Sequence, residues 1–245
     1  MRQLLSVEHL KMKRTMLKKL LILAPLGTMV IAFLAGSYFY SCALNWWYTI
    51  FFPVVLAIIC VQIQEKEKKK LNYQNLYMSP VPLSKIWTAK TLLAAGYSLF
   101  TCVFLSGIVI VAAKVLGVTM KTGSLTVLLA GLLMTLLCAY QIPIYLYLAK
   151  HCNFLVVFLV SIVFIVLGIM YSEKSYWIAV PSAWCNRSMY SVLHIMTNGL
   201  FLNKGEEALL VSIGSIIIAV CGCVGLFLLG TVLLGRIVKG EAEKK

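Results

Sequence analysis

The side chains that could carry out chemistry are few in this sequence, and they avoid its apolar stretches. There is no Asp, and the acidic residues are all Glu, at positions 8, 65, 67, 173, 206, 207, 241 and 243. His9, His151 and His194 also stand outside the apolar runs. Ion-coupled carriers usually place ionisable groups near the bilayer midplane, so this distribution disfavours a proton- or sodium-coupled transporter.

The motifs of common membrane enzymes and pumps are missing as well. A phosphate-binding loop needs Gly directly before Lys-Ser/Thr, and Lys121-Thr122 follows Met120 instead. The sequence contains no HExxH, and the apolar stretches hold no carboxylate for an intramembrane protease. We therefore expect no enzymatic activity, no cofactor and no metal site in this chain.

The eight Cys residues form no recognisable framework for a metal or for disulfides. Cys221 and Cys223 lie two positions apart, so on a helix they point to nearly opposite faces and cannot share one ion. Packing is the better interpretation of both. Cys42 and Cys185 both fall in predicted outer segments, and the sequence leaves open whether they pair.

The elements that carry these side chains are predicted from hydrophobicity. Hydrophobic residues make up 61% of the chain and its mean hydropathy is +0.93, against an apolar share of about 45–50% in soluble domains. A span needs about 20 apolar residues. The charge-free stretch between Lys19 and Glu65 is long enough for two spans, joined by residues 41–45.

The chain is thus predicted to be an all-α integral membrane protein, with residues 1–245 forming one transmembrane domain. Six spans are expected, at residues 20–40, 46–64, 87–113, 124–148, 153–171 and 209–234. The first is read as a span and not as a cleaved signal peptide, because five more spans follow it. Kinks are expected at Pro25, at Pro53 and at Gln141 with Pro143.

The charges predict how the spans are oriented. With the N-terminus inside, the inner segments hold 17 of the 22 Lys and Arg residues and the outer segments hold 5. This asymmetry follows the positive-inside rule and predicts that both termini lie in the cytoplasm. The net charge of +14 then reflects topology and lipid contact, and a nucleic-acid partner is not expected.

Two inner segments are each expected to form a helix outside the spans. Residues 1–19 are basic and predict a helix along the inner leaflet, the alternative being a solvated lead-in. Residues 65–86 form the main cytoplasmic loop, in which Tyr73, Leu76 and Tyr77 would share one face of a short helix that the following prolines end. This face is expected to point into the cytoplasm, the alternative being a helix that lies on lipid headgroups.

The outer loop at residues 172–208 is not polar enough to be free. It predicts an amphipathic helix at residues 182–199 before the last span, with Ser182 as N-cap, an end near Asn198-Gly199, and an apolar face of Met189, Val192, Leu193 and Met196. This helix would lie in the outer leaflet or between the spans, and its depth in the membrane is left open. In the last span, Ser215, Ala219 and Gly222 would let another helix approach, either within this chain or from a second subunit.

Several segments resemble one known family in their order and spacing. They are Glu8-His9-Leu10-Lys11-Met12-Lys13-Arg14-Thr15, Asn45-Trp46-Trp47-Tyr48-Thr49, Gln141-Ile142-Pro143, the stretch from Pro181 to Arg187, and Asn198-Gly199-Leu200. Together they resemble the lantibiotic-immunity ABC transporter permeases, in particular their MutE/EpiE branch, over nearly the whole chain.

The resemblance implies a type-2 ABC exporter fold and a multi-pass subunit of the bacterial cytoplasmic membrane. It also implies a second permease subunit, commonly non-identical, and a cytoplasmic ATPase dimer that holds ATP and Mg. The lantibiotic-immunity family expels antimicrobial peptides from the membrane and so confers immunity. Their loop between the second and third spans docks on the ATPase, which would be the role of Tyr73, Leu76 and Tyr77.

Two rival functions stay open at this point. One is export of another amphipathic substrate, such as a different bacteriocin or a lipid, and the other is a non-transporting membrane scaffold or sensor. Lantibiotics are often cationic, yet the outer segments carry a net +2, so electrostatic attraction should be weak. Peptide contact is therefore predicted through aromatic residues, the alternative being interfacial anchors: Trp46, Trp47, Tyr48, Trp177 and Trp184.

Overall fold

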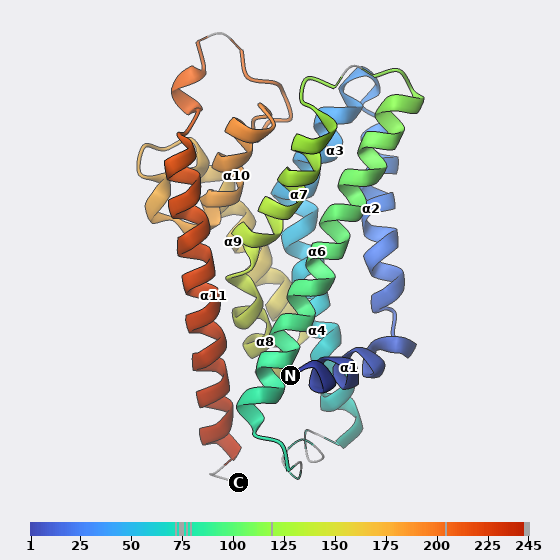
Figure 1. The fold of residues 1–245 in the computed structure, drawn as a ribbon, viewed down its shortest axis with the longest axis vertical. Coiled ribbons are helices and arrows are strands. Elements are labelled where there is room, and N and C mark those ends of the chain that lie inside the picture. Colours follow the sequence, from blue (N-terminus) through green and yellow to red (C-terminus); the bar gives the residue numbers. More distant parts are fainter. Residues whose placement is uncertain are drawn as a thin grey trace.

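The computed structural model describes residues 1–242 apart from 72, 74, 75, 77, 79, 119 and 204. Its helices form one elongated bundle (Figure 1). The N-terminus lies at the same end of the bundle as the end of the last helix, and we call this the inner end and its opposite the outer end. The main helices are α1 (Arg2–Lys11), α2 (Leu17–Phe33), α3 (Phe39–Trp46), α4 (Phe52–Leu71), α6 (Leu83–Val115), α7 (Ser124–Cys138), α8 (Gln141–His151), α9 (Phe154–Ser172), α10 (Pro181–Val192) and α11 (Ile213–Ala242).

Several of these helices are long and apolar enough to cross a membrane. In the described part of the chain there are four by length and composition: Gly36–Lys68, Leu83–Val115, Phe154–Ser172 and Ile213–Ala242. α7 and α8 meet at 52° and would make a fifth if they form one bent span. α2 has 17 residues, at the lower limit of about 17–25 for a span, so six spans and their orientation stay a prediction.

The predicted link at residues 41–45 is wrong, because these residues lie inside α3. The chain turns earlier, between α2 and α3, where Gly36 adopts a φ of +55° that side chains other than glycine rarely allow. α3 then continues through a π-helical turn, Trp47–Phe51, directly into α4. Pro53 follows this turn, and its missing N–H leaves a carbonyl of the preceding turn without its usual partner.

The expected kink in the fourth span is confirmed. α7 ends at Cys138 and α8 begins at Gln141, with Pro143 in its first turn. Because Pro143 cannot donate a backbone hydrogen bond and its ring crowds the preceding turn, the helix breaks just before it.

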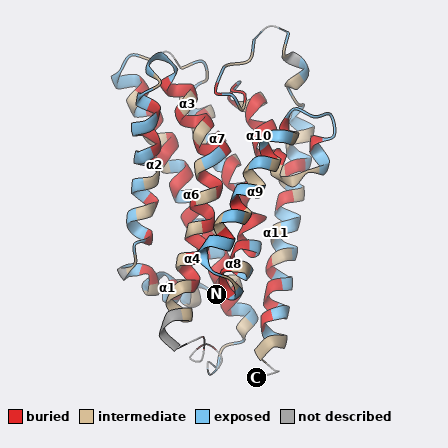
Figure 2. Cartoon of the chain, turned by 180° about the vertical axis from the view of Figure 1, so that it is seen from behind, coloured by how far each residue is buried: buried red, intermediate tan, exposed pale blue. Residues whose placement is uncertain are grey.

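Both predicted interfacial helices are shorter than expected. α1 ends at Lys11, and α10 ends at Val192 because His194 takes a left-handed φ of +55°. Ser182 is not the N-cap of α10, since Pro181 occupies the first helical position and Val180 precedes it. Residues 183–190 are all buried, so α10 lies between the other helices, which is one of the two placements expected for it (Figure 2).

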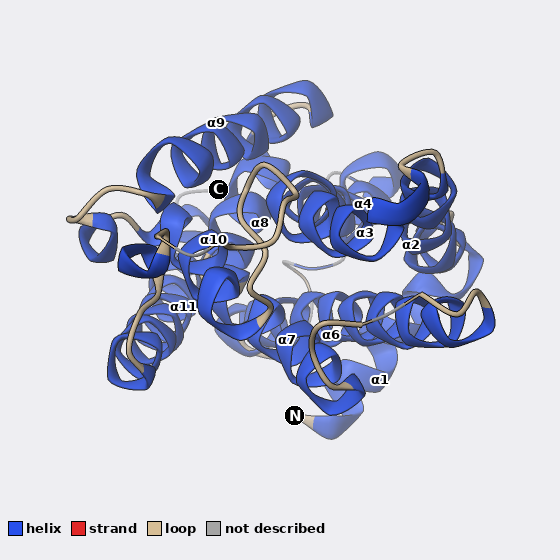
Figure 3. Ribbon diagram, turned by 90° about the horizontal axis from the view of Figure 1, so that it is seen from above, coloured by secondary structure: helices blue, strands red, loops and turns tan. Residues whose placement is uncertain are grey.

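The buried residues run through the middle of the bundle (Figure 2), and α9 and α11 lie at its edge (Figure 3). Many apolar side chains of these two helices are exposed. The inward face of α11 carries small residues in its outer half. Ala219 is fully buried, and a Cβ added to Gly222 would lie 2.7 Å from the Trp184 ring. These two residues therefore serve packing within the chain.

Candidate functional site

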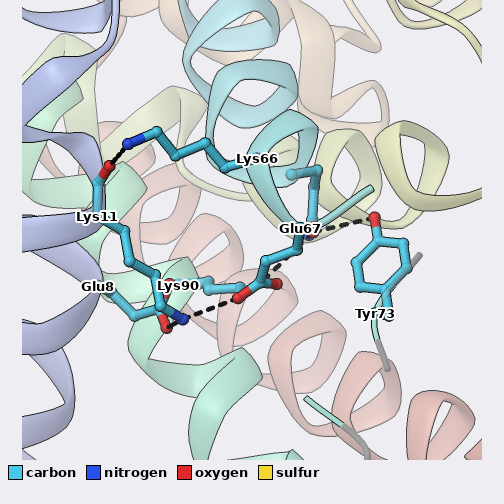
Figure 4. A network of polar contacts seen from close by, with 7 residues as sticks. Glu8, Lys11, Lys66, Glu67, Tyr73 and Lys90 are labelled. Atoms are coloured by element: carbon cyan, nitrogen blue, oxygen red, sulfur yellow. Dashed lines mark hydrogen bonds and ion pairs between the residues drawn. The ribbon is translucent and has the colours of Figure 1, made fainter. Parts of the chain in front are cut away.

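A buried group of charged and polar side chains joins three helices at the inner end (Figure 4). We call it the inner network: Glu8 and Lys11 from α1, Gln64, Lys66 and Glu67 from α4, and Lys90 from α6. It exists because α1 lies across the inner ends of α4 and α6 and turns its polar face toward them. Val7 and Leu10, on the other side of α1, stay exposed.

The Glu67 carboxylate is the centre of the inner network. The ammonium of Lys11 donates to Glu67 Oε1 at 2.8 Å and to Glu8 Oε1 at 2.5 Å. The ammonium of Lys90 pairs with the second oxygen of Glu67. Lys66 donates to the backbone carbonyl of Lys11, the last residue of α1, where a cation also offsets the negative end of the helix dipole.

Lys90 is the most deeply buried charge of the network, with none of its surface exposed. Besides Glu67 it has a hydrogen bond to Gln64 Oε1 at 3.4 Å, and its ammonium lies 5.0 Å from the centre of the Trp87 ring. A buried cation is tolerated only where a counter-charge and further polar contacts replace its hydration. The pairing of Lys90 with Glu67 thus fixes α6 against α4.

Trp87 connects the inner network to a second ion-pair group. The Lys150 ammonium lies 5.7 Å from the centre of the Trp87 ring. It also pairs with Glu241 near the end of α11. His151 Nε2 lies 3.1 Å from Glu241 Oε1. Charged contacts therefore run from α1 through α4, α6 and α8 to α11.

The electrostatics of this end follow from burial and pairing. Burial lowers the pKa of Lys11, but the hydrogen bonds and charges of Glu67 and Glu8 outweigh it, so the pKa lies above its ordinary value. Glu8 Oε2, Gln64 Nε2 and Trp87 Nε1 are buried without a hydrogen-bond partner among the described residues.

The predicted ATPase-coupling residues lie next to this network. Tyr73 and Leu76 are buried against Ile86 in a small apolar cluster, and Tyr77 lies outside the described residues. The Tyr73 hydroxyl donates to Gln64 Oε1 at 3.4 Å. The expectation that Tyr73 and Leu76 point into the cytoplasm is wrong, because the chain folds them back onto the start of α6.

The predicted peptide-contact residues are mostly packed inside the bundle. Trp47 is fully buried with its indole N–H 3.5 Å from the Cys102 sulfur, and the Tyr48 hydroxyl donates to the Ile195 carbonyl at 3.1 Å. Trp177 and Trp184 are buried too, and the Trp184 indole donates to the Ile178 carbonyl at 2.8 Å. Trp46 is partly exposed, which makes it the best placed of the five to touch a ligand.

Arg187 in α10 has a structural role that the sequence did not reveal. Its guanidinium donates to the carbonyls of Ser172 and Ala208, each at 3.2 Å, and so holds the end of α9 to the segment before α11. Burial lowers the pKa of Arg187, while Tyr190 and Glu173 act in the opposite direction.

The cysteines do not pair with one another in the structure. Each of the eight, all of which the structure describes, is a free thiol, including Cys42 and Cys185. Within the described residues no three His, Cys, Asp or Glu side chains gather closely enough to hold a metal ion.

An apolar groove of about 630 Å³ lies between the outer end of α2 and α6. Phe33 forms one wall, and the other is a face of α6 that includes Phe104, Gly107 and Val111. The groove offers almost nothing but hydrocarbon to an occupant, so it suits an acyl chain or an apolar side chain.

Long apolar helices around a core, with their buried ion pairs gathered at one end, define a multi-pass helical membrane protein. The sequence model of the family described as ABC-2 family transporter protein matches residues 4–181, more than two thirds of the chain. The chain belongs to this family, which supports a permease subunit of an ABC exporter. Such a subunit is a membrane component that is not itself catalytic, and the family implies partnership with an ABC ATPase. No curated protein and no solved structure matches it.

Proposed function

We propose that this permease expels a lantibiotic-type antimicrobial peptide from the bacterial cytoplasmic membrane and so gives the cell immunity to it. Membership in the ABC-2 family carries the transport part of the proposal. The substrate rests on the resemblance of segments such as Asn45–Thr49 and Gln141–Pro143 to lantibiotic-immunity permeases. The energy comes from ATP bound with Mg on a separate ATPase dimer, and a second permease subunit, commonly non-identical in the family that the chain resembles, completes the transporter.

In this proposal the inner network passes movements of the ATPase to the spans. The loop after α4 connects Leu71 to Leu83, so a force on it pulls on the ends of α4 and α6 together. Glu67 and Lys90 lie one or two turns inside these ends and are paired with each other. A rigid displacement of the loop would therefore move both helices, and α1 with them through Lys11.

Tyr73 and Leu76 have an indirect role in this mechanism. Since their side chains are buried against Ile86, they would hold the shape of the loop that the ATPase contacts, and the ATPase would touch the loop's outer surface. Met78, whose side chain is 84% exposed, lies on that surface.

The substrate would be recognised by apolar contact in the outer half of the bundle. Trp46 is partly exposed there, and the groove between α2 and α6 has room for an apolar group. Lys114 is exposed near the outer end of α6, and its positive charge gives no attraction to a cationic peptide. Apolar recognition suits a substrate that already lies in the membrane.

The experiment is a tolerance assay in a bacterium that is sensitive to lantibiotics. The chain is expressed with its neighbouring permease and ATPase, and growth is measured against a lantibiotic and against an unrelated pore-forming bacteriocin. We expect tolerance to rise for the lantibiotic and only when all subunits are present. A rise in tolerance to the unrelated bacteriocin alone would show that the substrate is not a lantibiotic but another bacteriocin. An unchanged tolerance to both peptides would favour a scaffold or sensor.

A matched pair of variants tests the recognition site. Trp46→Leu removes a partly exposed indole, whereas Trp47→Leu removes a fully buried one. If Trp46 touches the peptide, Trp46→Leu lowers tolerance at unchanged expression. Tolerance equal to that of the unmodified protein would assign Trp46 to the membrane interface.

A further inference from the structure

A second groove lies between the start of α2 and α4, and we call it the inner groove. It has a volume of about 180 Å³. Its lining residues come from the start of α2 and from α4: Met16, Lys19, Leu20, Leu23, Ile58 and Gln62. Positions 16, 19, 20 and 23 share one face of a helix, whereas Leu17 and Leu21 turn to the core. The groove is thus formed by a face of α2 that the core does not fully bury.

The inner groove has a polar end and an apolar end. α2 starts at the inner end of the bundle and α4 finishes there (Figure 1). Lys19 and Gln62 therefore lie toward the inner end, and Leu23 and Ile58 lie further into the bundle. A phospholipid in a leaflet has the same order, with its charged headgroup at the surface, its ester groups below and its acyl chains inside.

The chain carries a group of exposed lysines at the polar end of the groove. Lys13, Lys18 and Lys19 are exposed, and none of the three forms an ion pair with another described residue. Glu65, one turn beyond Gln62 on α4, is the acidic residue nearest to that glutamine in the sequence. One carboxylate against three ammonium groups leaves this end of the groove positive.

We propose that the inner groove binds an anionic phospholipid. One acyl chain fills the groove beside Leu23 and Ile58, and Lys18 and Lys19 hold the phosphate of the headgroup. Basic pockets between spans at the cytoplasmic side of a membrane bind anionic headgroups, and long lysine side chains reach from an apolar surface to the headgroup level. The Gln62 amide has no hydrogen bond to the described residues, so it is available to donate to an ester carbonyl.

The bound lipid would connect two helices that the inner network also joins. It contacts α2 and α4, and Gln62 lies about one and a half turns before Glu67 on α4. The lipid would therefore stabilise the arrangement of α1, α2 and α4 at the inner end. The inference is independent of the peptide substrate, so it and the proposed function can fail separately.

Photo-labelling with lipids tests the proposal on the full chain, reconstituted with its partner subunits in phosphatidylethanolamine vesicles. The vesicles contain a small fraction of phosphatidylglycerol or of phosphatidylcholine, each with the same diazirine in its acyl chain. We expect phosphatidylglycerol to label the peptides that hold residues 16–23 and 58–62 at least about fivefold more than phosphatidylcholine does, and unlabelled phosphatidylglycerol to compete. α9 has no charged residue, so both probes should label it equally.

Three results would overturn the inference. Equal labelling of the groove by the two probes would show that the headgroup is not recognised. Phosphatidylglycerol adducts spread evenly over α2 and α9 would show a general lipid shell and no site. Adducts on α9 with none in the groove would show that protein, such as the second permease subunit, covers the groove.

Two matched sets of variants separate the acyl chain from the headgroup. Leu23→Trp fills the groove from a position that is 60% exposed, and Ile22→Trp is its control on another face of α2. Only Leu23→Trp should reduce the groove adducts. Lys18→Gln with Lys19→Gln should abolish the preference for phosphatidylglycerol, whereas the same two lysines changed to Arg should keep it.

Thermal unfolding gives a second readout that needs no label. Added phosphatidylglycerol should raise the Tm of the detergent-solubilised permease, because a ligand of the folded state stabilises it. The rise should be lost in the variant with Lys18→Gln and Lys19→Gln and kept when Lys114 and Lys174, two exposed lysines near the outer end, are changed to Gln. An equal rise in both double variants would contradict a site at Lys18 and Lys19.

Discussion

Replacing Glu67 by Gln should destabilise the protein far more than the same change at Glu65. Glu67 accepts from both Lys11 and Lys90, and its loss leaves the fully buried Lys90 ammonium with a 3.4 Å contact to Gln64. Removing one partner of a buried pair costs about 3–5 kcal/mol. Glu65 is half-exposed, so its replacement should cost about 1 kcal/mol or less.

Thermal unfolding in detergent, followed by tryptophan fluorescence, measures this difference. For a chain of this size, 1 kcal/mol corresponds to a change in Tm of about 2–4 °C. Glu67→Gln should then lower Tm by about 6–20 °C and Glu65→Gln by less than about 4 °C. Equal Tm values for the two variants would show that Glu67 does not hold the inner network together.

An apolar pair separates stability from coupling. Well-packed hydrophobic residues often replace a buried ion pair without loss of stability. Glu67→Leu combined with Lys90→Leu should therefore bring Tm back toward that of the unmodified protein, since Glu8 and Lys11 keep each other as partners. The same protein should no longer stimulate the ATPase in response to peptide, and stimulation at the normal level would refute the proposed role of the pair.

Three further predictions concern packing and pH. Gly222→Leu would clash with a tryptophan ring on α10 and should lower stability by about 1–3 kcal/mol. A Cβ at residue 225 has nothing within 4 Å, so Gly225→Leu should not lower stability, and thermal unfolding measures both variants. Trp47→Leu should cost about 3 kcal/mol and reduce the folded yield in size-exclusion chromatography, while Trp46→Leu should leave the yield unchanged. The pKa of Lys11 is raised on folding, so its contribution to stability is complete below its ordinary pKa of about 10.4 and is lost as the pH rises through the folded value. The difference in Tm between the unmodified protein and Lys11→Met should therefore stay constant from pH 7 to pH 9. A difference that fades within that range would contradict the pairing of Lys11.

The positions of the long helices could be predicted from the sequence, because hydrophobic runs and their bounding charges are local signals. α6 and α9 begin and end within a few residues of the expected spans. The turn between α2 and α3 could not be placed, because the charge-free stretch from Lys19 to Glu65 must be divided into two spans without a charge to mark where, whereas the backbone turns where Gly36 permits it.

The inner network could not be predicted, because its pairs join residues far apart in the chain. Lys11 and Glu67 are separated by 56 positions, and Lys90 and Glu67 by 23. Lys90 stands near the start of the expected span at residues 87–113, where a cation indicates orientation and gives no sign that it is buried. The pattern of Tyr73 and Leu76 indicated a shared face but not its direction, since only the fold shows that this face covers Ile86.

Reconstitution in vesicles tests most directly whether this permease and its partners expel a lantibiotic from the membrane. The chain, its partner permease and the ATPase are placed in vesicles whose bilayer holds a fluorescently labelled lantibiotic, and release of the peptide into the medium is followed. We expect release that depends on ATP and stops when the ATPase's phosphate-binding lysine is replaced. Release at the same rate without ATP, or none with every subunit present and active in hydrolysis, would contradict it.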